Sequence, residues 1–147
     1  MSRKPAPKST FDRSRCPVAV TLDTLGDKWS LVVIRDLFFG KRKFSEFLAS
    51  PEGIKRNILT ERLRRLERAA VVARLRYQRR PDRYEYRLTR KGADLLPVLQ
   101  AIVGWAGANV PGVWTPPAEM LAARPERFYP SEGKKPARNA SRKRAKA

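Results

Sequence analysis

Histidine is absent from the chain, and Cys16 is its single cysteine. Zinc sites are built mainly from these two residue types, and Ser-His-Asp and Cys-His catalytic groups both need an imidazole. The sequence therefore predicts no metal site, no cofactor and no catalytic residues, so binding is the favoured class of function. A lone cysteine cannot form a disulfide within the chain, which indicates a reducing compartment.

Long apolar runs are also missing. The longest, Leu31–Ile34, is much too short to cross a bilayer, and the basic N-terminal residues lack the apolar stretch of a secretory signal. We therefore expect a soluble, cytoplasmic protein with no membrane partner.

Acidic residues are scarce. The 147 residues include 33 Lys and Arg but 14 Asp and Glu, a formal charge of +19 at pH 7, and such a surface attracts polyanions. Residues 1–15 hold five basic residues and one acid, and residues 134–147 hold seven basic residues and no acid. More than half of the excess charge therefore lies in the two ends. The 41% of apolar residues is enough for one core.

The segment Gly53–Arg68 combines an apolar stripe with an arginine-rich opposite face. Placed at about 100° per residue, its apolar side chains fall together: Ile58, Leu59, Leu63 and Leu66. The other side is polar: Arg56, Asn57, Thr60, Glu61, Arg64, Arg65 and Arg68. One face can pack on a core while the other enters a DNA groove. A solvated surface helix has the same periodicity, so the surrounding segments must decide.

Three shorter helices are predicted before this segment. Apolar spacing and the Pro and Gly residues at their ends give Pro17–Gly26, Lys28–Phe39 with Asp27 as N-cap, and Phe44–Ala49. The turn Ser50–Gly53 joins the third to the basic helix, expected at about Lys55–Ala69. Two helices joined by a short turn, the second basic on its outer face, are typical of a helix-turn-helix.

The apolar period then changes from 3.6 to 2. Alternation predicts two antiparallel strands, about Ala73–Tyr77 and Tyr84–Leu88, with one face packed. The polar turn Gln78–Arg83 between them suits a hairpin tip. A basic hairpin directly after a basic helix indicates a wing. Its tyrosines, Tyr84 and Tyr86, are more simply explained as core residues than as platforms for base stacking.

Thr89 is predicted to cap a long final helix, Arg90 to about Ala108, bent at Pro97. The expected fold is α+β and mostly helical, a winged helix-turn-helix domain over residues 16–110 with a two-stranded wing. Residues 1–15 are expected to form a flexible basic arm, residues 111–130 an irregular Pro-rich extension and residues 131–147 a disordered basic tail.

Several motifs match a known family in order and spacing: Cys16–Ala19, Leu25–Ser30, Arg42–Phe47, Gly53–Glu67, Tyr84–Gly92 and Leu95–Leu99. On these residues the chain resembles HxlR-type bacterial transcriptional regulators, which are related to the MarR group of winged-helix proteins. The resemblance implies a homodimer in which the first and last helices dimerise. It also implies that each subunit contacts DNA with one recognition helix and one wing.

Three positions depart from the family pattern. Lys55 and Arg56 stand where a small hydroxyl cap and a proline are usual, and they add charge at the end of the helix that faces DNA. Ala70 stands where a glycine usually follows the recognition helix, so we expect a differently shaped turn there.

The outer face of the basic helix holds the candidates for contact with double-stranded DNA. Asn57, Thr60 and Arg64 are first choices for reading base edges, with Arg56 close by, because arginine can bind guanine and asparagine can pair with adenine. Arg65 and Arg68 are expected to contact phosphate instead. The remaining candidates are Lys43 and Ser45 at the start of the third helix, Lys55, and the wing residues Arg79, Arg80 and Arg83. A solvated hairpin tip would carry similar residues.

Cys16 is a candidate redox sensor. It precedes Pro17 at a helix N-terminus and follows Arg13 and Arg15, a positive setting that favours a thiolate. Some regulators of the resembled family carry a sensing cysteine at this position. The alternative is a small packing residue.

The predicted function is therefore a sequence-specific DNA-binding transcriptional regulator, associated with the nucleoid and acting as a homodimer, with a small-molecule or redox effector. The alternative is a basic RNA-binding or nucleoid-associated architectural protein that uses charge without reading sequence. Loss of site discrimination in an Arg64→Ala variant would favour the first.

Overall fold

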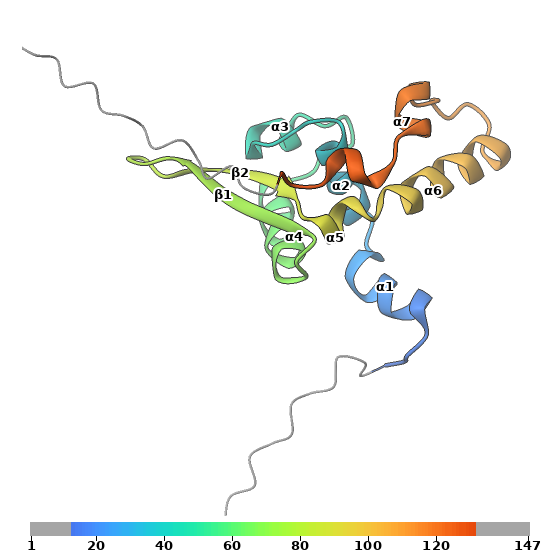
Figure 1. The fold of residues 1–147 in the computed structure, drawn as a ribbon, viewed down its shortest axis with the longest axis horizontal. Coiled ribbons are helices and arrows are strands. Elements are labelled where there is room, and N and C mark those ends of the chain that lie inside the picture. The colour runs from blue at the N-terminus through green and yellow to red at the C-terminus, as the bar shows by residue number, and fades with distance from the viewer. Residues whose placement is uncertain (1–12, 132–147) are drawn as a thin grey trace, which may run out of the picture.

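A computed structural model of the chain describes residues 13–131. The predicted arm and basic tail lie almost wholly outside the described residues. The elements follow in the order α1 Pro17–Leu25, α2 Ser30–Phe38, α3 Phe44–Leu48, α4 Arg56–Arg68, β1 Val72–Gln78, β2 Arg83–Leu88, α5 Arg90–Ala93, α6 Leu96–Asn109, α7 Ala118–Ala122 and the 3₁₀ helix η1 Pro125–Phe128 (Figure 1).

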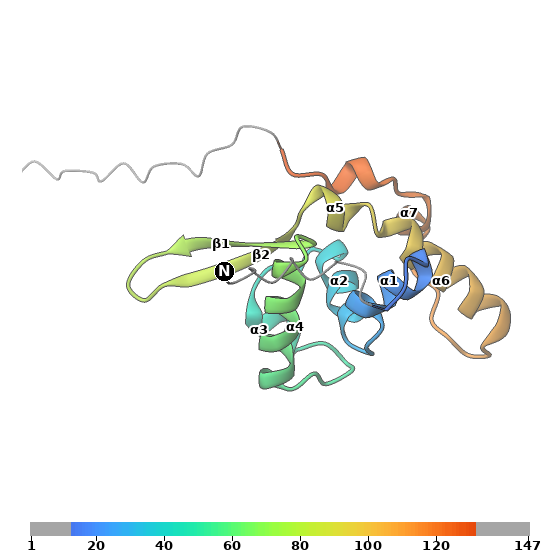
Figure 2. The ribbon, with the colours of Figure 1, turned by 90° about the horizontal axis from the view of Figure 1, so that it is seen from below.

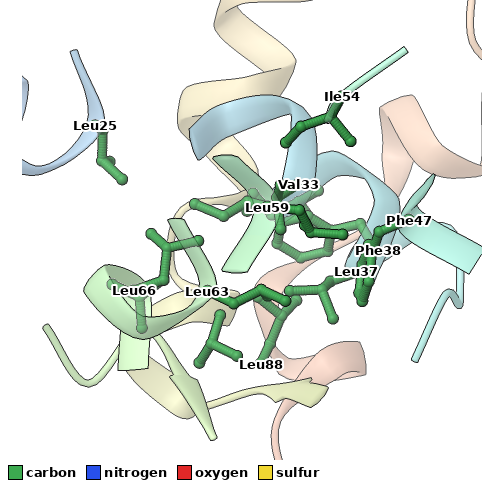
Figure 3. Close-up of a cluster of buried hydrophobic side chains, with 14 residues drawn as sticks. Leu25, Val33, Leu37, Phe38, Phe47, Ile54, Leu59, Leu63, Leu66 and Leu88 are labelled. Carbon is green, nitrogen blue, oxygen red and sulfur yellow. The ribbon is translucent and has the colours of Figure 1, made fainter. Parts of the chain in front are cut away.

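The core lies between α2, α4 and the base of the hairpin (Figure 3). Its largest fully buried side chains include Phe47, Leu37 and Leu63. In both ribbon views the wing formed by β1 and β2 projects from one end of the molecule, and α6 extends from the other (Figure 2). The predicted winged helix-turn-helix is confirmed.

The second helix begins at Ser30, two residues later than predicted. Asp27 nevertheless caps it, because its carboxylate accepts the backbone N–H groups of Trp29 and Ser30, each at 3.0 Å. The chain between Asp27 and Ser30 is a turn rather than helix. The prediction was right about the capping residue and wrong about the first helical residue.

The prediction of one long final helix is wrong. Thr89 does cap α5, since its hydroxyl oxygen accepts the Gly92 N–H at 3.1 Å, but α5 ends at Ala93 and α6 begins at Leu96. Pro97 lies in the first turn of α6, where a missing N–H costs no helical hydrogen bond. The proline therefore starts a second helix instead of bending a continuous one.

The hairpin is packed only at its base. Val72 pairs with Leu88 there, and both are buried. Leu75 pairs with Glu85, whereas Tyr86 pairs with Arg74, so Leu75 lies on the face of the hairpin opposite to Tyr86 and Leu88. Tyr86 packs on the core, but the side chains of Leu75 and Tyr77 are 46% and 44% exposed, so the expectation that the apolar residues of both strands share one packed face is wrong. The outer part of the wing projects beyond the helices (Figures 1 and 2).

The extension after α6 is more ordered than its prolines suggested. It contains α7 and η1, and the Phe128 ring packs edge-on against Phe38 of the core, with ring centroids 4.9 Å apart. The Tyr129 hydroxyl donates to the Asp94 carboxylate. The prediction of irregular structure was therefore wrong for the short helices, although the predicted packing on the domain is present.

Ala70 adopts the left-handed backbone conformation that glycine favours, with φ of 57°. The Val71 N–H donates to the Leu66 carbonyl and the Ala70 N–H to the Glu67 carbonyl, each at 3.0 Å. This is the Schellman arrangement that ends a helix. The turn therefore keeps the shape expected for a glycine, contrary to the sequence-based expectation.

We expect Ala70→Gly to stabilise the domain. Relief of the left-handed strain, about 1–2 kcal/mol, exceeds the entropy that glycine adds to the unfolded chain, about 0.4–1 kcal/mol. Urea unfolding should show a net gain of about 0.5–1 kcal/mol. Ala69→Gly is the matched control, because Ala69 has a φ of −78° and should lose stability. Equal losses in both variants would contradict the expectation.

Candidate DNA-binding surface

The orientation of α4 is set by its apolar side. Leu59, Leu63 and Leu66 are buried in the core. The opposite side of the helix therefore faces outward, and it carries Arg56, Asn57 and Arg64 as exposed side chains. The helix begins after Lys55, which is also exposed, so Lys55 and Arg56, two of the three departures from the family pattern, add charge at its N-terminal end.

Thr60 is partly exposed on the same outward side. Its hydroxyl donates to the carbonyl oxygen of Arg56 at 2.9 Å. The only hydrogen that the hydroxyl can donate is therefore used within the helix. The hydroxyl oxygen can still accept a hydrogen bond. Thr60 is therefore suited to meet a base amino group rather than a base carbonyl.

The start of α3 contacts both the start of α4 and the wing. The Arg56 guanidinium sits 5.3 Å from the Phe44 ring centroid, and the Lys43 ammonium sits 5.1 Å from that of Tyr77 in β1. The Tyr86 N–H of β2 donates to the Arg42 carbonyl at 2.8 Å, so the hairpin is also tied to this segment by its backbone. Three basic segments are thereby brought to one side.

Glu46 modifies the expected phosphate site at α3. Its carboxylate accepts the backbone N–H groups of Arg42 and Lys43, both at 2.7 Å, and these bonds lower the pKa of Glu46. Two backbone donors are thus occupied by the protein's own acid. The side chains of Lys43 and Ser45 remain exposed.

The wing tip is strongly basic. Arg79, Arg80 and Arg83 are exposed, and they occupy the turn and the first residue of β2. Asp82 lies 3.5 Å from the Arg76 guanidinium and so pairs with the strand. The three predicted wing residues therefore stand together at the far end of the hairpin (Figure 1).

A family model described as HxlR-like helix-turn-helix matches residues 24–113, which include every element from α2 to α6. The chain belongs to this family. Curated relatives are named HTH-type transcriptional regulators. Rv3095 of Mycobacterium tuberculosis is 36% identical over 103 residues, 70% of this chain and 65% of the relative. YdeP of Bacillus subtilis is 39% identical over 97 residues, 66% of this chain and 76% of the relative. The chain thus spans slightly less than two thirds of the mycobacterial relative.

Solved structures include other regulators with the same fold. The reduced form of the redox regulator HypR is 35% identical, with a TM-score of 0.59 over 63% of this chain and 92% of its own. PA1607, a candidate transcription factor, is 34% identical, with a TM-score of 0.64 over 83% of this chain and 92% of its own. The HxlR-like family and the winged-helix fold predicted from the motifs are confirmed.

Within this HxlR-like domain, two arginines of α4 face inward. Arg62 was not predicted as a functional residue, and its Nε donates to the Asp27 carboxylate at 2.7 Å. The half-buried Arg65 donates to the Asp23 carbonyl oxygen of α1. Both residues thus hold α4 against the α1–α2 region. A signal existed in the sequence, because Arg62 falls within the apolar arc between Ile58 and Leu66 when placed at about 100° per residue.

Asp27 is the acceptor at the centre of this contact. Burial alone would raise its pKa, but hydrogen bonds from the Ser30 hydroxyl, Trp29 amide, Arg62 guanidinium and Ser30 amide together lower the pKa to about 2. The Asp27 carboxylate therefore links the start of α2 to the middle of α4.

Acid should weaken the domain through Asp27. Its pKa of about 2 in the folded protein lies below the ordinary aspartate value of 3.8, so its stabilisation is complete above about pH 4 and is lost as pH falls toward 2. We expect Asp27→Asn to lose about 1–2 kcal/mol near neutral pH and progressively less below pH 4. Urea unfolding at a series of pH values measures this. A constant difference between the two proteins down to pH 2 would contradict it.

A buried polar cluster supports the turn before α4. Asp36 of α2 is 3% exposed, and its carboxylate accepts from the Arg35 guanidinium, the Lys41 ammonium and the Ser50 hydroxyl. Lys41 also donates to the Ser50 hydroxyl at 2.7 Å. Arg35 pairs in addition with Glu52, whose pKa is thereby lowered to about 2. The cluster connects α2 to the segment that leads into α4.

Within residues 13–131, no group of three or more acidic, His or Cys side chains is placed to hold a metal ion. No helix in the same range is both long enough and apolar enough to cross a membrane.

Proposed function

We propose that this protein is a sequence-specific DNA-binding transcriptional regulator. The observation that carries the proposal is the outward side of α4, where Asn57, Thr60 and Arg64 stand together beside two other basic segments. Membership of the HxlR-like family and the names of its curated relatives support it.

In this proposal α4 enters the major groove and the wing follows the DNA backbone. Arg64 and Arg56 would donate to guanine, and Asn57 would pair with adenine. Lys43, Ser45 and Lys55 would contact phosphate beside the groove, as would any donors of Arg65 left free by Asp23. Arg79, Arg80 and Arg83 would reach phosphates or a narrow minor groove.

The direct test is selection of bound fragments from random DNA by the full chain. Enrichment of one motif, followed by anisotropy titrations that favour it over scrambled DNA, supports sequence readout. Recovery of unrelated fragments with equal affinity would leave the second candidate, a non-specific architectural or RNA-binding protein. That candidate is favoured by the exposed arginines of the wing and the basic residues at both chain ends.

We also propose that the protein acts as a homodimer through α1 and α6. Both helices expose large apolar side chains, among them Val18 and Leu22 on α1 and Ile102 and Trp105 on α6. Exposed clusters of this kind mark interfaces in soluble proteins. In a symmetric dimer each chain would bury the same face, and the two α4 helices would meet half-sites about one helical turn, or a multiple of it, apart.

Leu22→Glu should split the dimer. The change removes an apolar contact and adds a charge in both copies, so the dimer dissociation constant should rise about a hundredfold or more. Sedimentation equilibrium measures it. The control is Leu75→Glu on the wing, since Leu75 is 46% exposed and Leu22 is 54% exposed. A monomeric wild-type chain, or equal effects of the two variants, would refute the interface.

Cys16 is the proposed redox sensor of the dimer. It is an exposed free thiol at the N-cap of α1, next to the proposed dimer face. Two such thiols from two subunits would reduce one hydrogen peroxide to two waters as they form one disulfide, and a quinone would alkylate the thiolate instead. Structures of HypR in reduced and oxidised forms support the comparison.

Treatment with peroxide or a quinone should change the DNA affinity of the wild type and leave Cys16→Ser unaffected. Non-reducing gels report the disulfide, and anisotropy reports the affinity. The sensor role would be wrong if wild-type affinity did not change, or if the serine variant responded fully.

A further inference from the structure

An apolar cavity of about 300 Å³ lies between α2, α6 and the extension that follows α6. Leu31 and Phe38 of α2 form one wall, Leu99 and Val103 of α6 form a second, and Trp114 and Met120 of the extension contribute the third. Cavities of about 300–1,000 Å³ with mostly apolar linings are the usual sites of small-molecule binding.

The third wall belongs to this chain rather than to the family domain, because the family match ends at residue 113. Its position is fixed by hydrogen bonds. The Gln100 side-chain amide donates to the carbonyl oxygens of Met120, Leu121 and Ala123 at 3.0, 3.2 and 2.9 Å. The docked Phe128 ring anchors the far end of the extension. The cavity is therefore held open by a structured wall.

The lining determines what the cavity can accept. Its one charged side chain, Arg35, is already paired with Asp36 and Glu52, so it offers little net charge to a ligand. The Phe39 and Trp114 rings stand at its margin with centroids 6.3 Å apart and planes inclined at 53°. Aromatic rings favour such tilted packing against one another. The lining thus suits an uncharged aromatic molecule.

We propose that this cavity binds one uncharged, mainly apolar small molecule containing an aromatic ring. The bound molecule would contact α2 directly. Arg35 of the cavity wall pairs with Asp36 and Glu52. The bound molecule would therefore also lie next to the polar cluster that supports the turn before α4. Regulation of DNA binding by this ligand rests on the proposed function, whereas ligand binding itself does not.

The test uses N-phenyl-1-naphthylamine, an uncharged aromatic fluorophore whose emission rises in apolar surroundings. Titration of the full chain should give a saturable rise with about one probe per chain. Val103→Trp, which fills the cavity, should weaken binding about tenfold or more, while Ala122→Trp, outside the lining, should not. Val32→Trp fills the same cavity from α2 and serves if Val103→Trp fails to fold by circular dichroism.

Three outcomes would overturn the proposal: no saturable rise, equal binding by wild type and both filled variants, or binding that appears only when the protein is diluted to monomers. The last would mean that a second copy fills the cavity. Anisotropy with selected DNA is measured separately. Probe binding without any DNA binding would refute the proposed function alone, and DNA binding without probe binding would refute this inference alone.

Discussion

Arg64→Ala should abolish most of the discrimination between a selected operator and scrambled DNA. Arg64 is exposed on the outward side of α4, opposite the buried leucines, whereas Arg62 and Arg65 donate to acceptors within the domain. A bidentate contact from arginine to guanine contributes about 1–3 kcal/mol of base discrimination. The affinity for the operator should therefore fall by that amount, while the affinity for scrambled DNA changes little.

Competition anisotropy at constant salt measures both affinities, and Arg68→Ala is the matched control. Arg68 is also an exposed arginine of α4, but it occupies the last helical residue. Its loss should weaken binding to all sequences by a similar, smaller factor, as expected for a phosphate contact. If Arg64→Ala behaved like Arg68→Ala, base readout by Arg64 would be refuted and charge alone would explain the binding.

Asp36→Ala should cause the largest loss of stability among single changes to polar residues outside α4. The substitution removes the shared acceptor of Arg35, Lys41 and Ser50. Removal of one partner from a buried ion pair costs about 3–5 kcal/mol, and the partial exposure of the two cations reduces this to about 2–4 kcal/mol. Urea unfolding followed by circular dichroism should show the loss.

Asp82→Ala is the control for Asp36→Ala. Asp82 is an exposed acid paired with an arginine in the wing, where a salt bridge contributes about 0–1 kcal/mol. Its loss should leave the midpoint of unfolding almost unchanged. A loss below about 1 kcal/mol in Asp36→Ala would mean that the cluster does not hold the turn before α4.

Most of the fold could be predicted because its helices bury one face each. The period of Leu59, Leu63 and Leu66 predicted α4 to within a residue at each end. Periodicity also located both strands, since Val72 and Leu88 begin and end the packed base of the hairpin. The sequence also predicted interactions between residues that are close in the chain, such as the helix caps formed by Asp27 and Thr89.

The predictions failed where distant segments decide the outcome. A proline such as Pro97 can bend a helix or begin one, and the choice depends on how α5 packs under the hairpin. Gly92 shows how close that packing is, because a Cβ atom there would lie 2.1 Å from the Val71 carbonyl oxygen. The order of the extension likewise depends on Phe38 and Gln100, which no local pattern around residues 111–130 reveals.

The sequence identified the residues of the candidate site more readily than the role of each one. The pattern placed Asn57, Thr60 and Arg64 on one outward face, and the structure has them there. It did not separate arginines that face outward from those that bind within the domain, because both kinds lie on a helix of high positive charge. The Asp36 cluster was also missed, since its members are up to 17 residues apart in sequence.

The inward arginines bear on how ionic strength should act on DNA binding. Arg35, Arg42, Arg62 and Arg65 already donate to carboxylate or carbonyl oxygens of the domain. Counterions are released only where a cation neutralises a DNA phosphate, and each such contact adds about 0.9 to the slope of log affinity against log salt. Arg35 and Arg62, which pair with carboxylates, would contribute little to that slope. The salt sensitivity of the proposed complex should therefore reflect the cations that reach phosphate, and it should fall well short of the formal charge of the chain.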